Sequence, residues 1–264
     1  MRLKERTCVV AGGATGWGRA VSERLAAEGA TVIVLDASQA EVDSTSAAIA
    51  KAGGRVRGFA VDIADQKAME ELVSDNRQIF QPASGLVTHY VAIAWGAFEE
   101  CDMEEFARIV RHNLVGPAIA TKVLLPILKA AGKASIVHLG SVDGIHGNPR
   151  VPSYSAAKGG LIPLTRVHSF EFAKYDIRVN TIASAQTVQI APEDMPPTAE
   201  LGFAGFPGAS YMQQLNDATP LKRYGPLTDW AGAAAFLLSE DADYITGTTL
   251  VVDCGRTAIT AGTQ

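Results

Sequence analysis

The chain has 264 residues, of which 47% are hydrophobic and 19% are charged, with a formal net charge of −5. This composition is typical of a globular protein rather than a disordered one, and the length suffices to bury a sizeable core. The acidic balance offers no basic footprint for nucleic acid or for an anionic membrane surface, which excludes functions that depend on binding a phosphate backbone.

The N-terminal part of the chain is predicted to form a strand, a helix and a second strand. An apolar run at Thr7–Ala11, followed by glycines, is typical of a strand buried on both faces. The helical pattern after the glycines is expected to end at Gly29, and a second apolar run, Thr31–Leu35, ends at Asp36. These features predict a βαβ unit with a glycine-rich first turn.

Helices and strands alternate along the rest of the chain. In chain order we expect a helix over 39–52, a strand over 56–61, a helix over 66–79, a strand over 85–92, a helix over 103–129, a strand over 134–139, a helix that carries Tyr154 and Lys158, a strand over 177–183, a helix over 228–238 and a strand over 248–252. The strands are near-continuous runs of Val, Ile, Ala and Leu. This predicts an α/β fold with one Rossmann-type, doubly wound parallel sheet covered by helices on both faces.

No linker or internal repeat divides the sequence, so we expect a single domain over 1–264. Its cofactor-binding half would span about 1–135, and its catalytic and substrate-binding half about 136–264. Within the helix that carries Tyr154, Pro163 is expected to cause a kink or a break, because proline removes a backbone donor and crowds the preceding turn.

A candidate dinucleotide site begins at Gly12, Gly16 and Gly18, between the first strand and the first helix. Glycines allow a tight turn and a close approach to a pyrophosphate, and the free N–H groups of the helix N-terminus attract the anion. Asp36 can accept hydrogen bonds from the adenosine ribose and would repel a 2′-phosphate, which predicts NAD rather than NADP. The alternative for Asp36 is a solvated acid at a strand end, and Asp62 either faces the adenine or caps a helix.

A candidate catalytic pair, Tyr154 and Lys158, lies four residues apart on one face of the expected helix. The ordinary pKa of tyrosine is near ~10, and a nearby cation favours the phenolate and lowers that pKa. The pair is therefore suited to general acid/base chemistry. Taken alone, this spacing more often means a half-buried ring beside a solvated charge.

With the glycine turn, the acid and Tyr-x-x-x-Lys in this order, the chain resembles the short-chain dehydrogenase/reductase family over essentially its whole length. The matching positions are Gly12, Gly16, Gly18, Asp36, Asp62, Asn113, Ser141, Tyr154, Lys158, the run Ile-Arg-Val-Asn at 177–180 and the closing segment at 244–253. Further cofactor contacts are expected at Thr15, Trp17, Ile63 and Thr187. The resemblance also implies a homodimer or homotetramer.

The resemblance implies a role for each of four residues. Tyr154 would exchange a proton with the substrate oxygen as hydride moves to or from the nicotinamide, and Lys158 would hold the nicotinamide ribose and lower the pKa of Tyr154. Ser141 would bind and orient the substrate oxygen. Asn113 would hold a water that links Lys158 to solvent.

Three segments depart from the pattern of the family. Ala11 stands where threonine is usual, the segment 89–92 (His-Tyr-Val-Ala) stands where Asn-Asn-Ala-Gly is usual, and Ser184-Ala185 replaces a common Pro-Gly pair. We expect the first two changes to be correlated, so that both hydrogen-bond partners are lost together, because losing one alone would leave a buried polar group unpaired at a cost of ~1–3 kcal/mol. The third changes the backbone that normally contacts the nicotinamide carboxamide.

Two segments are candidates for binding substrate. The loop at 142–150 includes Asp143 and His146, which either contact the substrate or belong to an ordinary polar surface loop. The segment at about 186–219 is rich in Met, Pro and aromatic residues, which favours a lid over a bulky apolar substrate or, alternatively, a subunit contact. Its candidate substrate contacts are Met195, Phe203 and Phe206, which would join Tyr154.

The cysteines Cys8, Cys101 and Cys254 are odd in number and widely spaced, which favours reduced thiols over a disulfide framework or a metal site. The charged N-terminus passes directly into a strand, and no apolar run approaches the ~20 residues of a membrane span. We therefore expect a soluble cytoplasmic protein with no signal peptide, no membrane partner and no bound metal.

The leading prediction is an NAD(H)-dependent oxidoreductase that interconverts a secondary alcohol and a ketone on a mid-sized apolar or cyclic small molecule. One alternative is an NADPH-dependent carbonyl or 3-oxoacyl reductase, which Asp36 argues against. Another is a catalytically silent NAD(H)-binding regulatory or scaffold protein, which would keep the glycines but lose the four residues that carry the chemistry. The sequence leaves open the substrate, the physiological direction and the stereochemistry at the carbinol.

Overall fold

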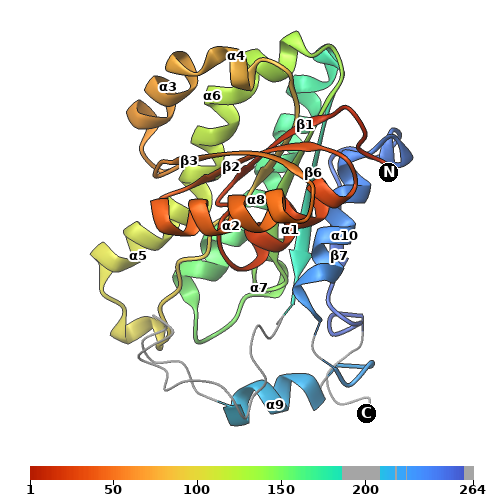
Figure 1. Cartoon of the computed structure of the whole chain (residues 1–264). Helices are drawn as coiled ribbons and strands as arrows, with labels where there is room; N and C mark the ends of the chain where they lie inside the picture. Colours follow the sequence, from red (N-terminus) through yellow and green to blue (C-terminus); the bar gives the residue numbers. More distant parts are fainter. Residues whose placement is uncertain (186–208, 218, 224, 259–264) are drawn as a thin grey trace.

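A computed structural model of the chain describes residues 1–185, 209–217, 219–223 and 225–258 (Figure 1). A seven-stranded sheet in the order β3-β2-β1-β4-β5-β6-β7 forms its centre, and every neighbouring pair of strands is parallel. The strands are β1 Thr7–Ala11, β2 Thr31–Asp36, β3 Arg55–Ala60, β4 Ala83–Thr88, β5 Ala134–Ser141, β6 Ile177–Ser184 and β7 Thr249–Val252. The predicted α/β fold with one parallel sheet is confirmed.

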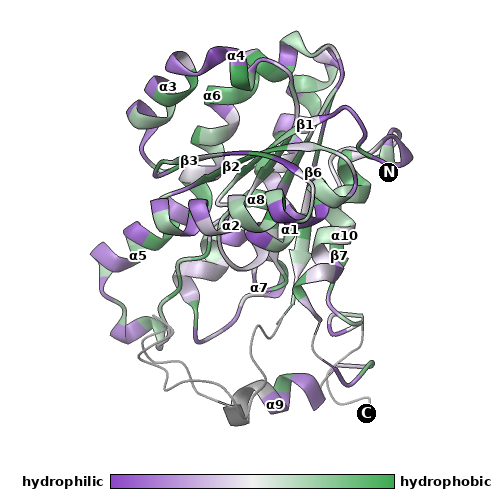
Figure 2. Ribbon diagram, in the orientation of Figure 1, coloured by the Kyte–Doolittle hydropathy of each residue, from purple (hydrophilic) through white to green (hydrophobic). Residues whose placement is uncertain are grey.

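Helices cover both faces of this sheet. Within the described ranges they are α1 Gly16–Ala27, α2 Gln39–Lys51, α3 Gln66–Asp75, α4 Arg77–Phe80, α5 Met103–Val110, α6 Gly116–Ala130, α7 Asp143–His146, α8 Pro152–Phe172, α9 Ala209–Asp217 and α10 Leu227–Leu238. Successive residues of a strand face opposite sides, so Cys8 and Val10 of β1 pack with α1, α2 and α10, while Val9 and Ala11 pack with α3 and α6. The inner strands β1 and β2 are accordingly hydrophobic along their length (Figure 2), whereas the edge strand β3 is partly exposed.

The order of the strands fixes where a ligand can bind. The chain runs outward from β1 through β2 to β3 and then returns to β4 on the other side of β1. In such doubly wound sheets the carboxyl ends of the strands form a crevice at the point where the order reverses. This edge holds the ends of β1, β2, β4 and β5, and α7 lies at the same end of the sheet (Figure 1).

The helix expected over 103–129 is divided by a π-helical turn at Arg111–Val115, which separates α5 from α6. The helices α5 and α6 belong to different hydrophobic clusters. Ile109 of α5 packs with Tyr154 of α8, whereas α6 packs on the sheet. The π turn inserts one residue into the helical repeat, which periodicity alone did not predict. Asn113 lies at its centre.

Other boundaries also differ from those expected. The helix expected over 66–79 is interrupted at Asn76, which caps α3, and its side-chain amide donates to Leu72 O at 3.0 Å. The strand expected over 85–92 ends at Thr88, because the following backbone turns across the end of β1 and His89 N–H donates to Ala11 O at 2.8 Å. Part of the segment expected to be irregular at 186–219 is helical, as α9 occupies Ala209–Asp217.

The helix α8 continues through Pro163 without the expected break. Pro163 is exposed, so its ring lies on the side of the helix away from the core, and the helix loses one backbone hydrogen bond there without ending. The helix thereby reaches from the carboxyl edge of the sheet to Phe172, which is buried in the core.

One helical stretch, Met103–Ala130, is long and apolar enough to cross a membrane by length and composition. Half of its most apolar window is buried inside the protein, which is typical of a core helix. Its apolar character is explained by α6 packing on the sheet.

A partly buried ion cluster fixes the N-terminus against the end of α1. The Glu28 carboxylate lies 2.8 Å from Arg2 Nη2 and 2.9 Å from Arg24 Nη2, and the Glu28 side chain is only 14% exposed. The hydrogen bond from Arg2 and then that from Arg24 lower the pKa of Glu28 to about 2. Glu28 therefore stabilises the fold in its ionised form.

We predict that Glu28→Gln lowers the free energy of unfolding by about 1–3 kcal/mol at pH 7. Because the pKa of Glu28 is lower in the folded protein than in the unfolded chain, this contribution is present above about pH 5 and is lost as the pH falls toward 2. Urea unfolding at pH values from 7 down to about 2.5 should show the wild type and variant converging, with most of the convergence below about pH 4. Glu23→Gln, at an exposed pair with Arg19, is the control and should change stability by under about 0.5 kcal/mol.

Candidate active site

In the glycine turn between β1 and α1, backbone atoms pack directly against other backbone atoms. A Cβ atom on Gly12 would lie 1.9 Å from His89 O, and one on Gly18 would lie 1.8 Å from Gly12 O. Gly12 also has a φ of 79°, in the left-handed region that favours glycine. Leu35 O accepts hydrogen bonds from the N–H groups of Gly12 and Gly13 at 2.7 and 2.9 Å, which fixes the turn to the end of β2.

The N-terminus of α1 is suited to an anion. Thr15 occupies the N-cap position with an extended backbone, its exposed side chain makes no capping hydrogen bond, and the first turn contains no acidic residue. The N–H groups of a first turn carry partial positive charge and need partners from outside the helix. The pyrophosphate of a dinucleotide fits this requirement.

Asp36 lies at the end of β2 and faces the glycine turn. Its Oδ2 accepts from Ala14 N–H at 3.0 Å and its Oδ1 from Ala37 N–H at 2.8 Å. Each carboxylate oxygen keeps a lone pair for a further donor, such as a ribose hydroxyl. Arg19, the basic residue next to the glycines, is paired with Glu23 at 2.8 Å.

Asp62 does not cap a helix. Its Oδ1 accepts from Ala64 N–H at 2.9 Å, while Asp65 caps α3 by accepting from Ala68 N–H at 3.1 Å. The capping alternative for Asp62 is therefore wrong. The neighbouring Ile63 is fully buried.

His89 makes a polar contact with the glycine turn. Its Nδ1 lies 3.2 Å from Gly12 O, and its buried ring packs edge-on against Trp17 at 5.6 Å between centroids. The sequence did not predict this contact, in which the imidazole reaches the glycine turn from the position of the usual amide. The ring of Trp17 also stacks on Trp230 at 4.5 Å, so its side chain packs within the protein.

Tyr90 is a site residue that sequence reasoning did not assign. Burial and the charges of Asp62 and Asp36 raise the pKa of Tyr90, so its hydroxyl lies near both acids. Its ring packs on His112 at 4.8 Å between centroids. The signal in the sequence was the position of Tyr90 in the segment 89–92, which departs from the family pattern. That departure predicted a larger side chain but not where the side chain points.

Lys158 is buried, with 1% exposure, and its ammonium is held by two backbone carbonyls. Nζ donates to Tyr90 O and to Leu139 O, both at 2.9 Å, and lies 5.6 Å from the centroid of the Tyr154 ring. An ammonium has three donors, so one remains for a ligand such as a ribose hydroxyl. Burial lowers the pKa of Lys158 to about 7.

Tyr154 and Ser141 meet at the carboxyl edge of the sheet and share a hydrogen bond between their side chains. Burial and the charge of Asp143 raise the pKa of Tyr154, and the hydrogen bond with Ser141 opposes this. The expectation that Lys158 sets a low pKa for Tyr154 is not met in the protein alone, where burial dominates. The phenol is therefore protonated at neutral pH, and the two hydroxyls together can bind an oxygen atom and transfer a proton to it.

The amide of Asn113 is fixed by the π turn. Nδ2 donates to Ala92 O at 2.7 Å and to Ile109 O at 3.0 Å. Oδ1 is buried and has no hydrogen-bond partner among the residues that the structure describes. An acceptor oriented in this way fits a bound water, because a buried carbonyl oxygen without a partner is costly.

Ser184 connects the ends of β6 and β5. Its Oγ donates to Gly140 O at 3.0 Å, and its carbonyl accepts from Val142 N–H at 2.9 Å. These bonds flank Ser141 on both sides, so the residue that replaces the usual proline helps to fix the position of Ser141.

The predicted substrate residues are only partly brought together. Asp143 is partly buried beside Ser141, whose Oγ accepts from Asp143 N–H at 3.1 Å, while His146 is exposed at the end of α7. Thr187, Met195, Phe203 and Phe206 lie outside the described residues.

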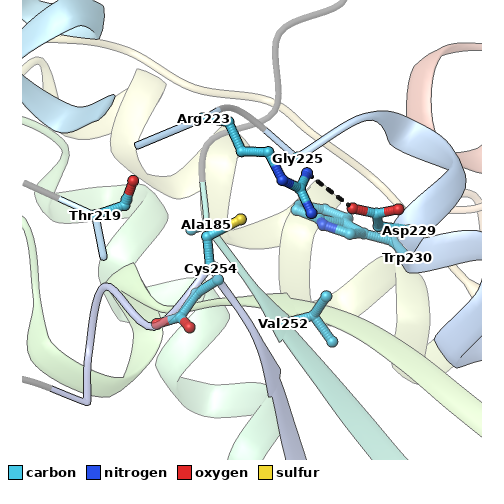
Figure 3. Close-up of a pocket in the computed structure, with 9 residues that line it drawn as sticks. Ala185, Thr219, Arg223, Gly225, Asp229, Trp230, Val252 and Cys254 are labelled. Atoms are coloured by element: carbon cyan, nitrogen blue, oxygen red, sulfur yellow. Dashed lines mark hydrogen bonds and ion pairs between the residues drawn. The ribbon is translucent and has the colours of Figure 1, made fainter. Parts of the chain in front are cut away.

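A separate pocket lies at the ends of β6 and β7 (Figure 3). Its lining residues are Ala185, Thr219, Arg223, Gly225, Asp229, Trp230, Val252, Asp253 and Cys254. An ion pair of 3.4 Å between Arg223 and Asp229 spans part of it. None of the four residues predicted to carry the chemistry lines this pocket, so it is distinct from the Ser141–Tyr154 pair.

Comparisons with known proteins agree with this arrangement. A family model described as Enoyl-(Acyl carrier protein) reductase matches residues 12–257. Levodione reductase of Leifsonia aquatica is 30% identical over 97% of this chain and 96% of its own length. A 2,5-dichloro-2,5-cyclohexadiene-1,4-diol dehydrogenase of Sphingobium indicum is 31% identical over 97% and 99%. A solved structure described as a short-chain dehydrogenase/reductase of Burkholderia xenovorans has a TM-score of 0.86 at 30% identity and covers 98% of this chain and 99% of that chain.

We predict that Gly144→Ala disturbs the site through the backbone of α8. A Cβ at Gly144 would lie 2.5 Å from Lys158 C and 2.6 Å from Gly159 N, which are backbone atoms that cannot move independently. Overpacking of this kind costs about 1–3 kcal/mol. Urea unfolding should show that loss for Gly144→Ala, whereas the control Gly232→Ala, in α10 with space for a methyl group, should be neutral or stabilising.

Proposed function

The chain belongs to the short-chain dehydrogenase/reductase family, whose members are oxidoreductases that bind a nicotinamide cofactor and act on small molecules, and on this premise we propose that it interconverts a secondary alcohol and a ketone with NAD(H). The observation that carries the proposal is the buried arrangement of Ser141, Tyr154 and Lys158. The phenol is protonated and hydrogen-bonded to Ser141, and the ammonium is held by two carbonyls. A catalytically silent binding protein would have no need to keep this arrangement.

In the proposed mechanism each residue has a distinct task. A bound nicotinamide dinucleotide would supply the acceptor or donor of hydride. Ser141 Oγ holds the substrate oxygen, and Tyr154 donates a proton to that oxygen in ketone reduction or receives one in alcohol oxidation. Lys158 keeps one donor for the cofactor ribose, and its charge favours the phenolate when Tyr154 loses its proton. Asn113 Oδ1 holds a water on the route from Lys158 to solvent.

The preference for NAD over NADP rests on Asp36. Its carboxylate is held beside the glycine turn by Ala14 N–H, where it suits a ribose diol and repels a phosphate. Arg19, which would otherwise attract a phosphate, is paired with Glu23. An NADPH-dependent carbonyl or 3-oxoacyl reductase is the alternative, since the matching family model describes an acyl carrier protein reductase.

For the substrate we propose a mid-sized apolar or cyclic alcohol or ketone. The name of the Sphingobium indicum relative specifies a cyclohexadiene diol, which supports a cyclic substrate.

We further propose a cytoplasmic homodimer or homotetramer. The exposed apolar side chains of Val167 and Phe170 on α8, at 50% and 86% exposure, support a subunit contact on that helix.

We predict that Tyr154→Phe lowers kcat for a cyclic secondary alcohol by roughly 10²–10⁴-fold, because the variant keeps the ring but cannot transfer the proton. NADH binding, followed by fluorescence, should stay within about threefold of the wild type. The control Tyr244→Phe, at a fully exposed tyrosine, should retain full activity. Undiminished turnover by Tyr154→Phe would refute the mechanism.

We predict that the wild type binds NADH at least about tenfold more tightly than NADPH, because the Asp36 carboxylate and a 2′-phosphate repel one another. Asp36→Asn should reduce this ratio, and the exposed acid-to-amide control Asp75→Asn should not. Titration calorimetry with both cofactors measures the ratio. Tighter binding of NADPH by the wild type would favour the NADPH-dependent alternative.

A further inference from the structure

Asp143 is an acid beside the reacting groups that the proposed mechanism does not use. It begins α7 two residues after Ser141, and its N–H donates to Ser141 Oγ at 3.1 Å. The next residue, Gly144, packs directly on the backbone of Lys158 and Gly159 in α8. Asp143 is therefore held at a fixed place relative to both Ser141 and the helix that carries Tyr154.

The charge of the Asp143 carboxylate acts on the Tyr154 hydroxyl, whose pKa it helps to raise. The Asp143 carboxylate is partly buried and, among the residues that the structure describes, accepts a single long hydrogen bond, from Asn148 Nδ2 at 3.5 Å. A carboxylate offers about four lone-pair sites, and a buried one is costly unless those sites are used. The Asp143 carboxylate thus has the capacity to accept a donor from a molecule bound at Ser141 and Tyr154.

The charge around Asp143 indicates what kind of donor fits. Burial raises the pKa of Asp143, and the positive charge of Arg256, on the loop after β7, opposes this rise and so partly balances the carboxylate. An ammonium group would be repelled by Arg256, and an anionic group would be repelled by Asp143. A neutral hydroxyl group, which donates without adding charge, satisfies both neighbours.

We propose that Asp143 selects substrates that carry a second hydroxyl group near the reacting carbinol, and that the Asp143 carboxylate accepts the hydrogen bond from this second hydroxyl. The proposal rests on the proposed function and names the substrate class of that same site as diols or hydroxyketones. The second hydroxyl keeps its proton and takes no part in the redox step. Asp143 is a specificity residue that binds the part of the substrate that does not react.

The test compares three alcohols that differ at one position. For the wild type with NAD⁺, kcat/KM for cis-1,2-cyclohexanediol should exceed that for cis-2-methoxycyclohexanol and for cyclohexanol by about tenfold or more, because a hydrogen bond to a charged acceptor is lost in both analogues. In Asp143→Ala this preference should fall to within about twofold. The readout is this preference, the ratio of kcat/KM for the diol to that for cyclohexanol, because a merely structural defect would lower both values together and leave the ratio unchanged.

Two further variants make the test robust. Asp143→Asn preserves the shape of the side chain and removes its charge, so it should fold like the wild type and show an intermediate preference for the diol. Asp75→Asn, the same change at an exposed acid of α3, should keep the full preference. Far-ultraviolet circular dichroism confirms that each variant is folded.

Several results would overturn the proposal. It fails if the wild type oxidises the diol no better than its methyl ether, or if Asp143→Ala lowers kcat/KM equally for all three alcohols. Preference for trans-2-aminocyclohexanol over the diol would assign Asp143 to a cation instead. If the wild type oxidises none of these alcohols and reduces no matching ketone with either NAD(H) or NADP(H), the proposed function fails as well, which separates the two cases.

Discussion

The buried ammonium of Lys158 is the interaction on which the rest of the site depends. Its two hydrogen bonds join the segment after β4 to the end of β5, and the residue itself belongs to α8. A buried cation without such acceptors would be strongly destabilising, so these carbonyls must stay where they are. One charge therefore holds together the three parts of the chain that form the site, before any ligand is bound.

The sheet supplies the geometry that this charge requires. Because all neighbouring strands are parallel, the ends of β1, β2, β4 and β5 meet at one edge, and the residues after each strand converge there. Ser184 adds a second constraint by joining β6 to both neighbours of Ser141. The result is a candidate site in which backbone hydrogen bonds fix the positions of Ser141 and Tyr154.

The fold followed from the sequence because strand hydrophobicity and the glycine turn are local signals. Apolar runs such as Thr7–Ala11 identify buried strands wherever they pair, and the spacing of Tyr154 and Lys158 requires only a helix. The parts that could not be predicted depend on contacts between distant segments. The imidazole of His89 reaches Gly12 O across 77 positions of the sequence, and the burial that keeps the Tyr154 phenol protonated depends on side chains from α5 and from the segment after β4.

The π-helical turn at Arg111–Val115 has a consequence for how this protein can change over evolutionary time. An extra residue in a helix rotates everything beyond it by about 100°, so α5 and α6 present different sides although the chain runs through both. Ile109 of α5 packs beside Tyr154, and α6 packs on the sheet. Mutations on α5 can therefore change the packing beside Tyr154 while the packing of α6 on the sheet stays the same.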